Sequence, residues 1–407
     1  MGKIDELIKQ LCPDGVKFVK LGDFFDMFKG MSKVSKKWAD TGNCKFIDYL
    51  NIYNNMTVDV AKLQNATVAT FKQNNLKEGD ILFTCASETP YECAISAVIR
   101  EPIAENTFLD DHLNGIRVKR EFKEMVLPAF INYYFYSVAF RKSICKIVRG
   151  VTRFYIVNKS FLNIMIPLPP LAVQEKIVEV LDTFTGMIDN LQKELEQRQK
   201  QFEHYRDQML TFKEGEVQMK PIKEIGKLVR GNGLQKKDFT EDGTGCIHYG
   251  QIYTRFGLST SSTLTFVDSQ LAAKLTKVSP GDLVIACTSE NIEDVCKSVA
   301  WLGKEDIVTG GHACVFKHSE NPKYIAYCFT TSAFFLQKRK YAYGAKVIDI
   351  KTEKLGEITL PVPSLEKQQE IVDKLDTFEA LISNIKQEIE LRQKQYEFYR
   401  EKLLTFE

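Results

Sequence analysis

The chain has 407 residues, of which 44% are hydrophobic and 27% charged, and its formal net charge is +2. This composition is ordinary for a globular protein and excludes disordered and collagen-like classes. At roughly 100–200 residues per domain the length predicts two to four domains. With so small a net charge, a nucleic-acid surface requires local clustering of basic residues.

The sequence predicts neither a membrane span nor a secreted protein. The longest apolar runs, such as 127–130 and 164–168, fall far short of the roughly 18–20 residues that cross a bilayer. The N-terminus is charged and amphipathic, unlike a secretory signal. The ten cysteines form no C-x-x-C pair and lie mostly in apolar contexts. We expect buried, reduced thiols in a cytoplasmic protein, without disulfides or a metal site.

The first element in chain order is a short N-terminal helix, expected over residues 3–12. Its apolar residues Ile4, Ile8 and Leu11 precede residue 16 much as the end of a later helix precedes residue 217. The segment therefore resembles the end of a helix that begins at the C-terminus. We expect the two chain ends to meet, which makes the molecule circular with pseudo-two-fold symmetry.

A globular region follows. GDILFTCASE at 79–88 and AISAVIR at 94–100 have the apolar character of buried strands. An amphipathic helical stretch is expected over Leu127–Ser143, and Gly150 and Arg153 stand shortly after it. Strands and helices do not alternate strictly, so the predicted fold class is mixed α/β (α+β).

Residues 167–213 form the first long helix. Pro167 and Pro169 keep the approach extended, and the proline-free stretch that follows is rich in good helix formers. Apolar residues recur in alternating steps of three and four, a period of 3.5 that indicates a coiled-coil seam. The seam comprises Leu181, Phe184, Ile188, Leu191, Leu195, Arg198, Phe202, Tyr205, Met209 and Phe212.

The second half of the chain repeats the first. GDLVIACTSE at 281–290 matches GDILFTCASE, and a second helical stretch is expected over Tyr324–Lys338. The helix at 361–407 copies that at 167–213 with an offset of 194 and no gap. Its seam comprises Leu375, Phe378, Ile382, Ile385, Ile389, Arg392, Tyr396, Tyr399, Leu403 and Phe406.

Two matching helices joined by a whole domain most simply form an antiparallel pair. Bundling with the helices of a partner is the competing interpretation, and both can hold together. One seam position in each copy is an arginine, Arg198 or Arg392. Such a polar seam residue either fixes register and partner choice or reaches out of the seam to solvent.

Several catalytic classes lack their motifs. There is no P-loop, and Gly231-Asn-Gly233 lacks the third glycine and the context of a dinucleotide site. Asn321-Pro-Lys-Tyr324 resembles an amino-methyltransferase motif without its second proline, and we interpret it as a turn. Asp110-Asp111-His112 corresponds to Gly310-Gly311-His312, so a loop is favoured over a metal site. We expect no catalytic residues.

The duplicated arrangement resembles the specificity subunits of type I restriction-modification systems. The features that carry the resemblance are PLPPLAVQEKI at 167–177 with its copy at 361–371, and the helix ends Tyr205-Arg206 and Tyr399-Arg400. GDILFT-x-x-SE at 79–88 and Gly150-x-x-Arg153 are also similar to that family. The resemblance covers essentially the whole chain.

The resemblance implies target-recognition domains at 1–166 and 214–360, each reading half of an interrupted, asymmetric DNA sequence. The long helices at 167–213 and 361–407 would set the spacer between the half-sites. Two methyltransferase subunits and two motor-nuclease subunits would dock on this chain. Methylation with S-adenosylmethionine, ATP hydrolysis and Mg²⁺-dependent cleavage would belong to those partners, and this chain would hold no cofactor.

Contacts to double-stranded DNA need basic and polar side chains on exposed loops. In the first half the candidates are Lys33, Lys36, Lys37, Ser87, Glu88, Thr89, Arg149, Arg153 and Tyr155. In the second half they are Arg230, Lys236, Lys237, Tyr253, Arg255, Ser289, Glu290, Asn291, Arg339, Lys340, Tyr343 and Lys346.

Alternative functions remain open. The chain could be a coiled-coil scaffold whose globular domains read no DNA, or a silent, orphan specificity subunit. A lone methyltransferase or nuclease is disfavoured by the missing motifs.

Overall fold

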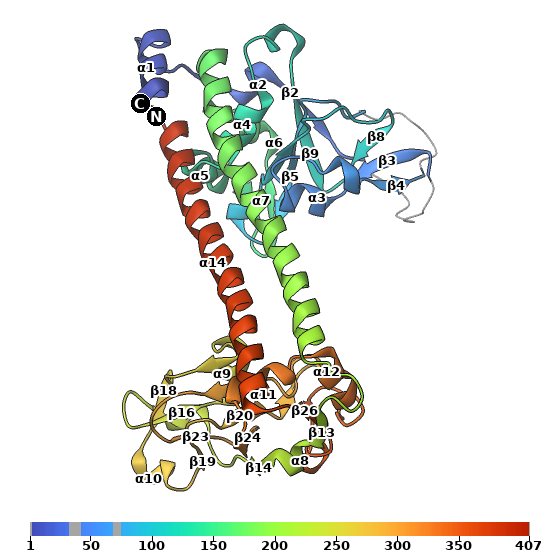
Figure 1. The fold of residues 1–407 in the computed structure, drawn as a ribbon. Coiled ribbons are helices and arrows are strands. Elements are labelled where there is room, and N and C mark those ends of the chain that lie inside the picture. The colour runs from blue at the N-terminus through green and yellow to red at the C-terminus, as the bar shows by residue number, and fades with distance from the viewer. Residues whose placement is uncertain (1, 32–41, 68–74, 407) are drawn as a thin grey trace. The chain divides into compact units, whose positions relative to one another are not determined.

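A computed structural model describes residues 2–31, 42–67 and 75–406 (Figure 1). The chain divides into two compact units. Unit 1 comprises Met1–Leu191 with Glu388–Glu407, and unit 2 comprises Gln192–Gln387. Within the described ranges, no helix is both long and apolar enough to cross a membrane.

Unit 1 mixes helices with short strands. Its helices are α1 (Gly2–Leu11), α2 (Leu21–Phe24), α3 (Tyr49–Asn54), α4 (Pro128–Phe135), α5 (Val138–Ile147), α6 (Asn158–Leu162), the start of α7 (Leu171–Met209) and the end of α14 (Leu365–Leu404), with 3-10 turns η1 (Val60–Lys62), η2 (Pro90–Glu92) and η3 (Arg120–Phe122). Its strands are β1 (Phe18–Lys20), β2 (Phe25–Lys29), β3 (Cys44–Ile47), β4 (Gln64–Ala66), β5 (Ile81–Thr84), β6 (Ala86–Ser87), β7 (Ser96–Val98), β8 (Thr107–Leu109), β9 (Leu113–Val118), β10 (Val148–Arg149), β11 (Phe154–Ile156) and β12 (Met165–Pro167).

Unit 2 has a similar, though not identical, set of helices and strands. Its helices are the end of α7, α8 (Ile222–Ile225), α9 (Tyr249–Thr254), α10 (Ser269–Ala272), α11 (Pro322–Cys328), α12 (Ser332–Lys338), α13 (Thr352–Leu355) and the start of α14, with the 3-10 turn η4 (Lys236–Asp238). Its strands are β13 (Gln218–Pro221), β14 (Gly226–Arg230), β15 (Phe239–Thr240), β16 (Thr244–Ile247), β17 (Ser259–Thr260), β18 (Thr265–Val267), β19 (Thr276–Val278), β20 (Leu283–Ala286), β21 (Thr288–Ser289), β22 (Ser298–Trp301), β23 (Ile307–Thr309), β24 (Ala313–His318), β25 (Ile348–Asp349) and β26 (Thr359–Val362).

The main sheets of the two units share one topology. The sheet of unit 1 has the order β2-β9-β5-β7, and that of unit 2 has β14-β24-β20-β22 with β17 added at the edge. Both predicted GD strands lie at the centre, as β5 and β20, and all four residues of each are buried. Continuous apolar runs of this kind are expected of strands covered on both faces. The predicted mixed α/β fold and its duplication are confirmed.

Each predicted helical stretch after the sheet consists of two helices. The helical stretch expected over Leu127–Ser143 is broken between α4 and α5, where the Ser137 hydroxyl accepts a hydrogen bond from the Phe140 N–H. In unit 2, Thr331 caps α12 by accepting from the Phe334 N–H in the same way. A hydroxyl at this position satisfies an orphan amide and starts a new helix.

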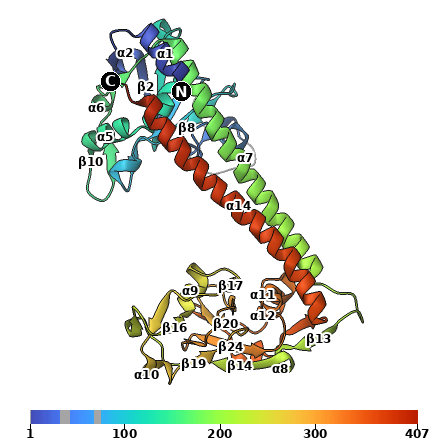
Figure 2. The ribbon, with the colours of Figure 1, turned by 60° about the vertical axis from the view of Figure 1, so that its left-hand side comes forward.

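The two chain ends belong to the same core. The first hydrophobic core of unit 1 contains Ile4 of α1 together with Leu403 and Leu404 at the end of α14. Figures 1 and 2 both show the N- and C-terminal labels close together. The predicted circular organisation is therefore confirmed.

Candidate nucleic-acid interface and paired helices

In unit 1 the start of α7 packs against the end of α14 along the predicted seam. Leu181 is fully buried, and Ile188 and Ile389 are also buried. Phe184 stacks on Tyr399, with ring centroids 5.1 Å apart. The seam thus joins two segments that are far apart in sequence into one apolar core.

In unit 2 the same contact occurs with the roles exchanged. Tyr205 of α7 stacks on Phe378 of α14, with ring centroids 5.5 Å apart, while Leu375 and Ile385 are buried. Because the beginning of each helix meets the end of the other, α7 and α14 run antiparallel, as predicted. The half-buried seam positions are Leu191, Leu195, Phe202, Met209, Phe212, Ile382 and Phe406, and Tyr396 and Leu403 are buried.

The two seam arginines bond within their own helices. Arg198 donates to Glu194 at 3.4 Å and to Gln201 at 3.1 Å, and Arg392 pairs with Glu388 at 2.7 Å. Both guanidinium groups are half-buried, and their partners lie three or four residues away on the same helix face. These intrahelical bonds favour the interpretation that the arginines reach out of the seam.

The aspartate of the repeated Leu-Asp-Thr-Phe sequence ties each helix to its globular region. In unit 1, Asp182 accepts from the Tyr133 hydroxyl at 2.6 Å and from the Arg100 guanidinium at 2.7 Å. In unit 2, Asp376 accepts from the Tyr327 hydroxyl at 2.8 Å and pairs with Lys323. Sequence reasoning recognised the repeat but assigned no role to this carboxylate.

A fully buried glutamine anchors the first turn of each long helix. Gln174 accepts from the Leu127 N–H at 2.8 Å and donates to the carbonyls of Met125 at 2.8 Å and Pro169 at 2.7 Å. Gln368 likewise accepts from the Asn321 N–H at 2.9 Å. The carboxamide is suited to this place because it both donates and accepts.

The far end of each long helix carries a carboxylate that meets a globular helix. Glu401 accepts from the backbone N–H of Val138 at 2.9 Å, at the start of α5. Asp207 accepts from the N–H of Ser332 at 3.3 Å, at the start of α12. A carboxylate at a helix N-terminus is favoured by the orphan amides and the helix dipole.

The candidate DNA contacts divide into described and undescribed residues. Lys33, Lys36 and Lys37 lie outside the described residues, so the first basic cluster stays a prediction. Most of the others lie on loops, turns and strand ends of the two units, whereas Tyr253 lies in α9, Tyr155 in the middle of β11, and Lys236 and Lys237 in η4. Their role in DNA binding stays a prediction.

The loop after β6 is held by one carboxylate. Glu92 accepts hydrogen bonds from Ser87 at 2.9 Å, Thr89 at 3.0 Å and Tyr53 at 3.0 Å, and these bonds lower the pKa of Glu92. Ser87 is buried, whereas Thr89 and Glu88 are exposed. In this arrangement the hydroxyls shape the loop, and their role as DNA ligands stays a prediction.

The corresponding loop of unit 2 is held differently. The Tyr253 hydroxyl donates to the Thr288 carbonyl at 2.5 Å, and burial raises the pKa of Tyr253. Asn291 is exposed and bonds Asp294 through both its side-chain oxygen and its amide nitrogen. Ser289 is half-buried. Tyr253 therefore braces the loop from beneath rather than projecting from it.

The basic candidates of unit 2 differ in accessibility. Arg230 is half-buried, pairs with Asp349 at 3.2 Å and donates to the Gly311 carbonyl at 3.2 Å. Through these bonds Arg230 links β14 to β25 and to the loop that contains Gly311. The exposed basic candidates are Lys236, Lys237, Arg255, Arg339, Lys340 and Lys346. Glu290, Asn291 and Tyr343 are exposed as well.

Three candidates of unit 1 share one hairpin. Arg149 ends β10, Tyr155 lies opposite it on β11, and Arg153 precedes β11. All three are exposed, and the Arg153 guanidinium lies 6.0 Å from the centre of the Tyr155 ring. The hairpin therefore presents two cations and an aromatic ring to solvent.

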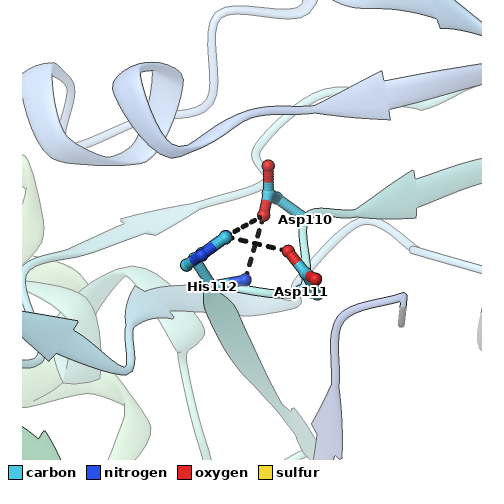
Figure 3. Close-up of side chains that lie close together, drawn as sticks. All are labelled: Asp110, Asp111 and His112. Carbon is cyan, nitrogen blue, oxygen red and sulfur yellow. Dashed lines mark hydrogen bonds and ion pairs between the residues drawn. The ribbon is translucent and has the colours of Figure 1, made fainter. Parts of the chain in front are cut away.

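Asp110, Asp111 and His112, which follow β8, contact one another. Figure 3 shows His112 facing Asp110 and Asp111, with Nδ1 2.9 Å and 2.8 Å from their carboxylate oxygens. The His112 backbone N–H also donates to Asp110 at 2.9 Å. These three residues lie close enough to share a metal ion. However, His312 in unit 2 bonds Thr288 at 3.1 Å and follows two glycines, so the duplicated feature is the loop histidine.

The ten cysteines differ in burial: seven are buried, Cys12 and Cys85 are half-buried, and Cys145 is exposed, so the prediction of buried thiols holds for most of them but not for Cys145. Burial raises the pKa of Cys93 to about 11 and that of Cys328 to about 12. Thiols with raised pKa values are poor nucleophiles near neutral pH.

The comparisons with known proteins agree with the duplication. Residues 13–198 and 214–391 each match the family described as the type I restriction modification DNA specificity domain. The chain belongs to this family. The chain is 34% identical over 267 residues to the EcoR124I/EcoR124II specificity subunit of Escherichia coli, covering 62% of this chain and 66% of that subunit.

Other relatives point the same way. A putative type I specificity subunit of Haemophilus influenzae is 27% identical over 299 residues, covering 70% of this chain and 74% of that protein. The S subunit from M. genitalium has a TM-score of 0.53 at 13% identity, with 96% of each chain covered. A chain from a study of complex assembly in the type I R-M system has a TM-score of 0.60 at 16% identity, covering 96% of this chain and 97% of that one. The predicted specificity-subunit function is confirmed, and the solved structures support the fold.

Proposed function

We propose that this specificity subunit reads an interrupted, asymmetric DNA site, one half through each unit, and performs no chemistry itself. The observation that carries the proposal is the duplication of a similar globular region on each end of one antiparallel helix pair. The stacking of Phe184 on Tyr399 recurs as that of Tyr205 on Phe378. Two similar but non-identical readers suit two different half-sites, as dimeric DNA-binding proteins match two-fold sites.

The assembly implied by this function supplies the chemistry. We propose that two methyltransferase subunits and two motor-nuclease subunits dock on this chain in the cytoplasm, where the DNA is. S-adenosylmethionine, ATP and Mg²⁺ would bind to those partners. Within this chain the residues would position DNA and partners only.

The deciding experiment is co-expression with a type I methyltransferase subunit that co-purifies with this chain, followed by sequencing of methylated adenines across the host genome. A two-part adenine-methylated motif is expected. Methylation in the absence of this chain would instead make the partner the reader. Complex formation without any two-part motif would favour the scaffold or silent-subunit alternative.

The helix pair predicts the spacer. Inserting seven residues after Leu191 and seven after Gln387 adds about 10 Å to each helix and keeps the 3.5-residue phase of the seam. Since DNA rises about 3.4 Å per base pair, the spacer should lengthen by roughly three base pairs. Methylome sequencing measures the spacer length directly.

The matched control inserts the same seven residues in α7 alone, which misaligns the seam and should lower the yield of the complex without defining a new spacer. An unchanged spacer with both helices lengthened would show that the helices do not set the distance.

The exposed cations of unit 2 predict salt-dependent affinity. Replacing Lys236, Lys237 and Arg255 together by Ala should weaken binding of the assembled complex to all DNA sequences alike. Each lost phosphate contact lowers the slope of log affinity against log salt by about 0.9. Fluorescence anisotropy at several salt concentrations measures both quantities.

The charge-matched control replaces Lys227, Lys274 and Lys304, which are exposed in the same unit, by Ala. It should change affinity much less. Equal losses in the two triple variants would mean that overall charge, rather than a located phosphate contact, accounts for the effect.

A further inference from the structure

We propose that the hairpin at residues 148–156 in unit 1, and its counterpart at 343–350 in unit 2, is the base-reading element of each half. The tip residues 151–153 and 345–347 would determine which bases are accepted. The inference rests on the proposed function, since it assigns the reading of each half-site to one element.

The hairpin of unit 1 stands on a buried base. Val148 pairs with Ile156 and Arg149 with Tyr155, while Tyr155 also pairs with Ala86 of β6. Val148 and Ile156 belong to the hydrophobic core of the unit. Buried side chains at the base and exposed ones at the tip make a fixed ribbon with an accessible end.

The hairpin of unit 2 repeats this register. Tyr343 pairs with Asp349, through backbone bonds of 3.0 and 2.8 Å, and Asp349 pairs with Thr288 of β21. The next residue, Ile350, is fully buried and donates its N–H to the Cys287 carbonyl at 3.1 Å. Two domains that match only weakly in sequence here keep the same backbone pairings.

A glycine fixes the shape of both tips. Gly150 has φ +133° and Gly344 has φ +118°. A Cβ on Gly150 would lie 1.9 Å from the Arg153 carbonyl oxygen, and one on Gly344 would lie 1.9 Å from that of Val347. Only glycine fits this backbone without rearrangement. Both hairpins therefore have the same glycine-dependent turn.

The side chains that follow the glycine differ between the units. Unit 1 has Val151, Thr152 and Arg153, whereas unit 2 has Ala345-Lys346-Val347. Val151 is 88% exposed and Val347 is 59% exposed. A constant turn with variable, solvent-facing residues is the pattern expected where one scaffold reads two different sequences.

The chemistry of the tips suits base edges. The major groove admits a two-stranded ribbon, arginine bonds guanine through two acceptors, and small apolar groups contact the thymine methyl. Arg153 and Val151 supply these two kinds of contact in unit 1. Lys346 and Val347 supply a donor and an apolar group in unit 2. Tyr155, beneath Arg153, limits the directions that the guanidinium can take.

Neighbouring candidates support the hairpin rather than compete with it. Ser87 and Thr89 are bonded to Glu92 beside strand β6, on which β11 pairs. Arg230 bonds Asp349 at the base of the second hairpin at 3.2 Å. These residues hold the ribbon in place, which leaves its tip as the part free to reach a groove.

The test is a single substitution in one hairpin tip, followed by measurement of the methylated motif, in which only one half-site should change. Arg153→Ala, in complex with the co-expressed methyltransferase, should relax one or two positions of a single half-site and leave the other half-site unchanged. Loss of a bidentate base contact should reduce discrimination there on the order of tenfold or more. Lys346→Ala should affect the opposite half-site.

The control Arg120→Ala removes an exposed arginine of η3 in the same unit and should leave the motif unaltered. Exchanging residues 345–347 for Val-Thr-Arg provides a gain-of-specificity version, in which the second half-site acquires new preferred bases. Circular dichroism and co-purification with the methyltransferase verify folding of each variant.

The outcomes separate this inference from the proposed function. A wild-type two-part motif that persists base for base in Arg153→Ala and in the tip exchange would overturn the inference alone. Uniformly weaker methylation of the same motif would also overturn it, because it indicates a phosphate contact. A wild-type complex with no two-part motif would overturn the proposed function, and the inference with it.

Discussion

Replacing Gln174 by Leu is expected to destabilise unit 1 by about 3–6 kcal/mol. Leucine has a similar size, so packing changes little, but it leaves the Leu127 N–H and the Met125 and Pro169 carbonyls without their partner. Each buried polar group left unsatisfied costs about 1–3 kcal/mol, and the contacts to Leu127 and Met125 contribute at the low end of this range because they are only partly buried. Urea unfolding followed by circular dichroism, with hydrogen exchange to locate the loss in unit 1, measures the effect.

The same substitution elsewhere supplies the controls. Gln368→Leu should destabilise unit 2 in the same manner, because Gln368 is also fully buried. Gln197→Leu, at an exposed position of α7, should change stability by less than about 0.5 kcal/mol. Similar urea midpoints of unfolding for the Gln174→Leu and Gln197→Leu variants would contradict the anchoring role of the buried Gln174 carboxamide.

Gly150→Ala is expected to distort the hairpin tip of unit 1 and abolish discrimination at one half-site. The added Cβ cannot occupy a position 1.9 Å from the Arg153 carbonyl oxygen, so the turn must rearrange. Backbone strain of this kind costs about 1–3 kcal/mol. Faster exchange of the Arg149 and Tyr155 amides, which belong to paired residues, should accompany the altered motif.

Gly186→Ala is a control substitution that should raise stability, whereas Gly150→Ala should lower it. Gly186 lies in α7, where an added Cβ would meet nothing within 4 Å, and the second repeat has Ala380 at the matching place. Gly186→Ala should therefore stabilise the chain by about 0.5–1 kcal/mol. Equal effects of the two glycine substitutions would refute the requirement for glycine at the tip.

Features with a local or periodic signal could be predicted from the sequence. The offset of 194 residues indicates the duplication, and the 3.5-residue period indicates both long helices and their seam. The GD strands were predictable because their apolar runs are bounded by turn residues. In each case the signal lies within a few consecutive residues or repeats at a fixed spacing.

Features that depend on distant partners could not be predicted in this way. Asp182 has no unusual neighbours in sequence, and its role comes from Tyr133, 49 residues away, and Arg100, 82 residues away. The break between α4 and α5 depends on one serine, a residue that is also tolerated within helices. Which hydroxyls face DNA and which bond Glu92 depends on the loop geometry, and their role as DNA ligands stays a prediction.

The division of the chain has a consequence during translation. Unit 2 is one continuous segment, Gln192–Gln387, whereas unit 1 needs Glu388–Glu407 to cover its first core. All of unit 2 therefore emerges from the ribosome before Glu388–Glu407, the part of α14 that completes the first core of unit 1. Although domains generally fold in the order of synthesis, the first core of unit 1 gains its α14 residues only after unit 2 has been made.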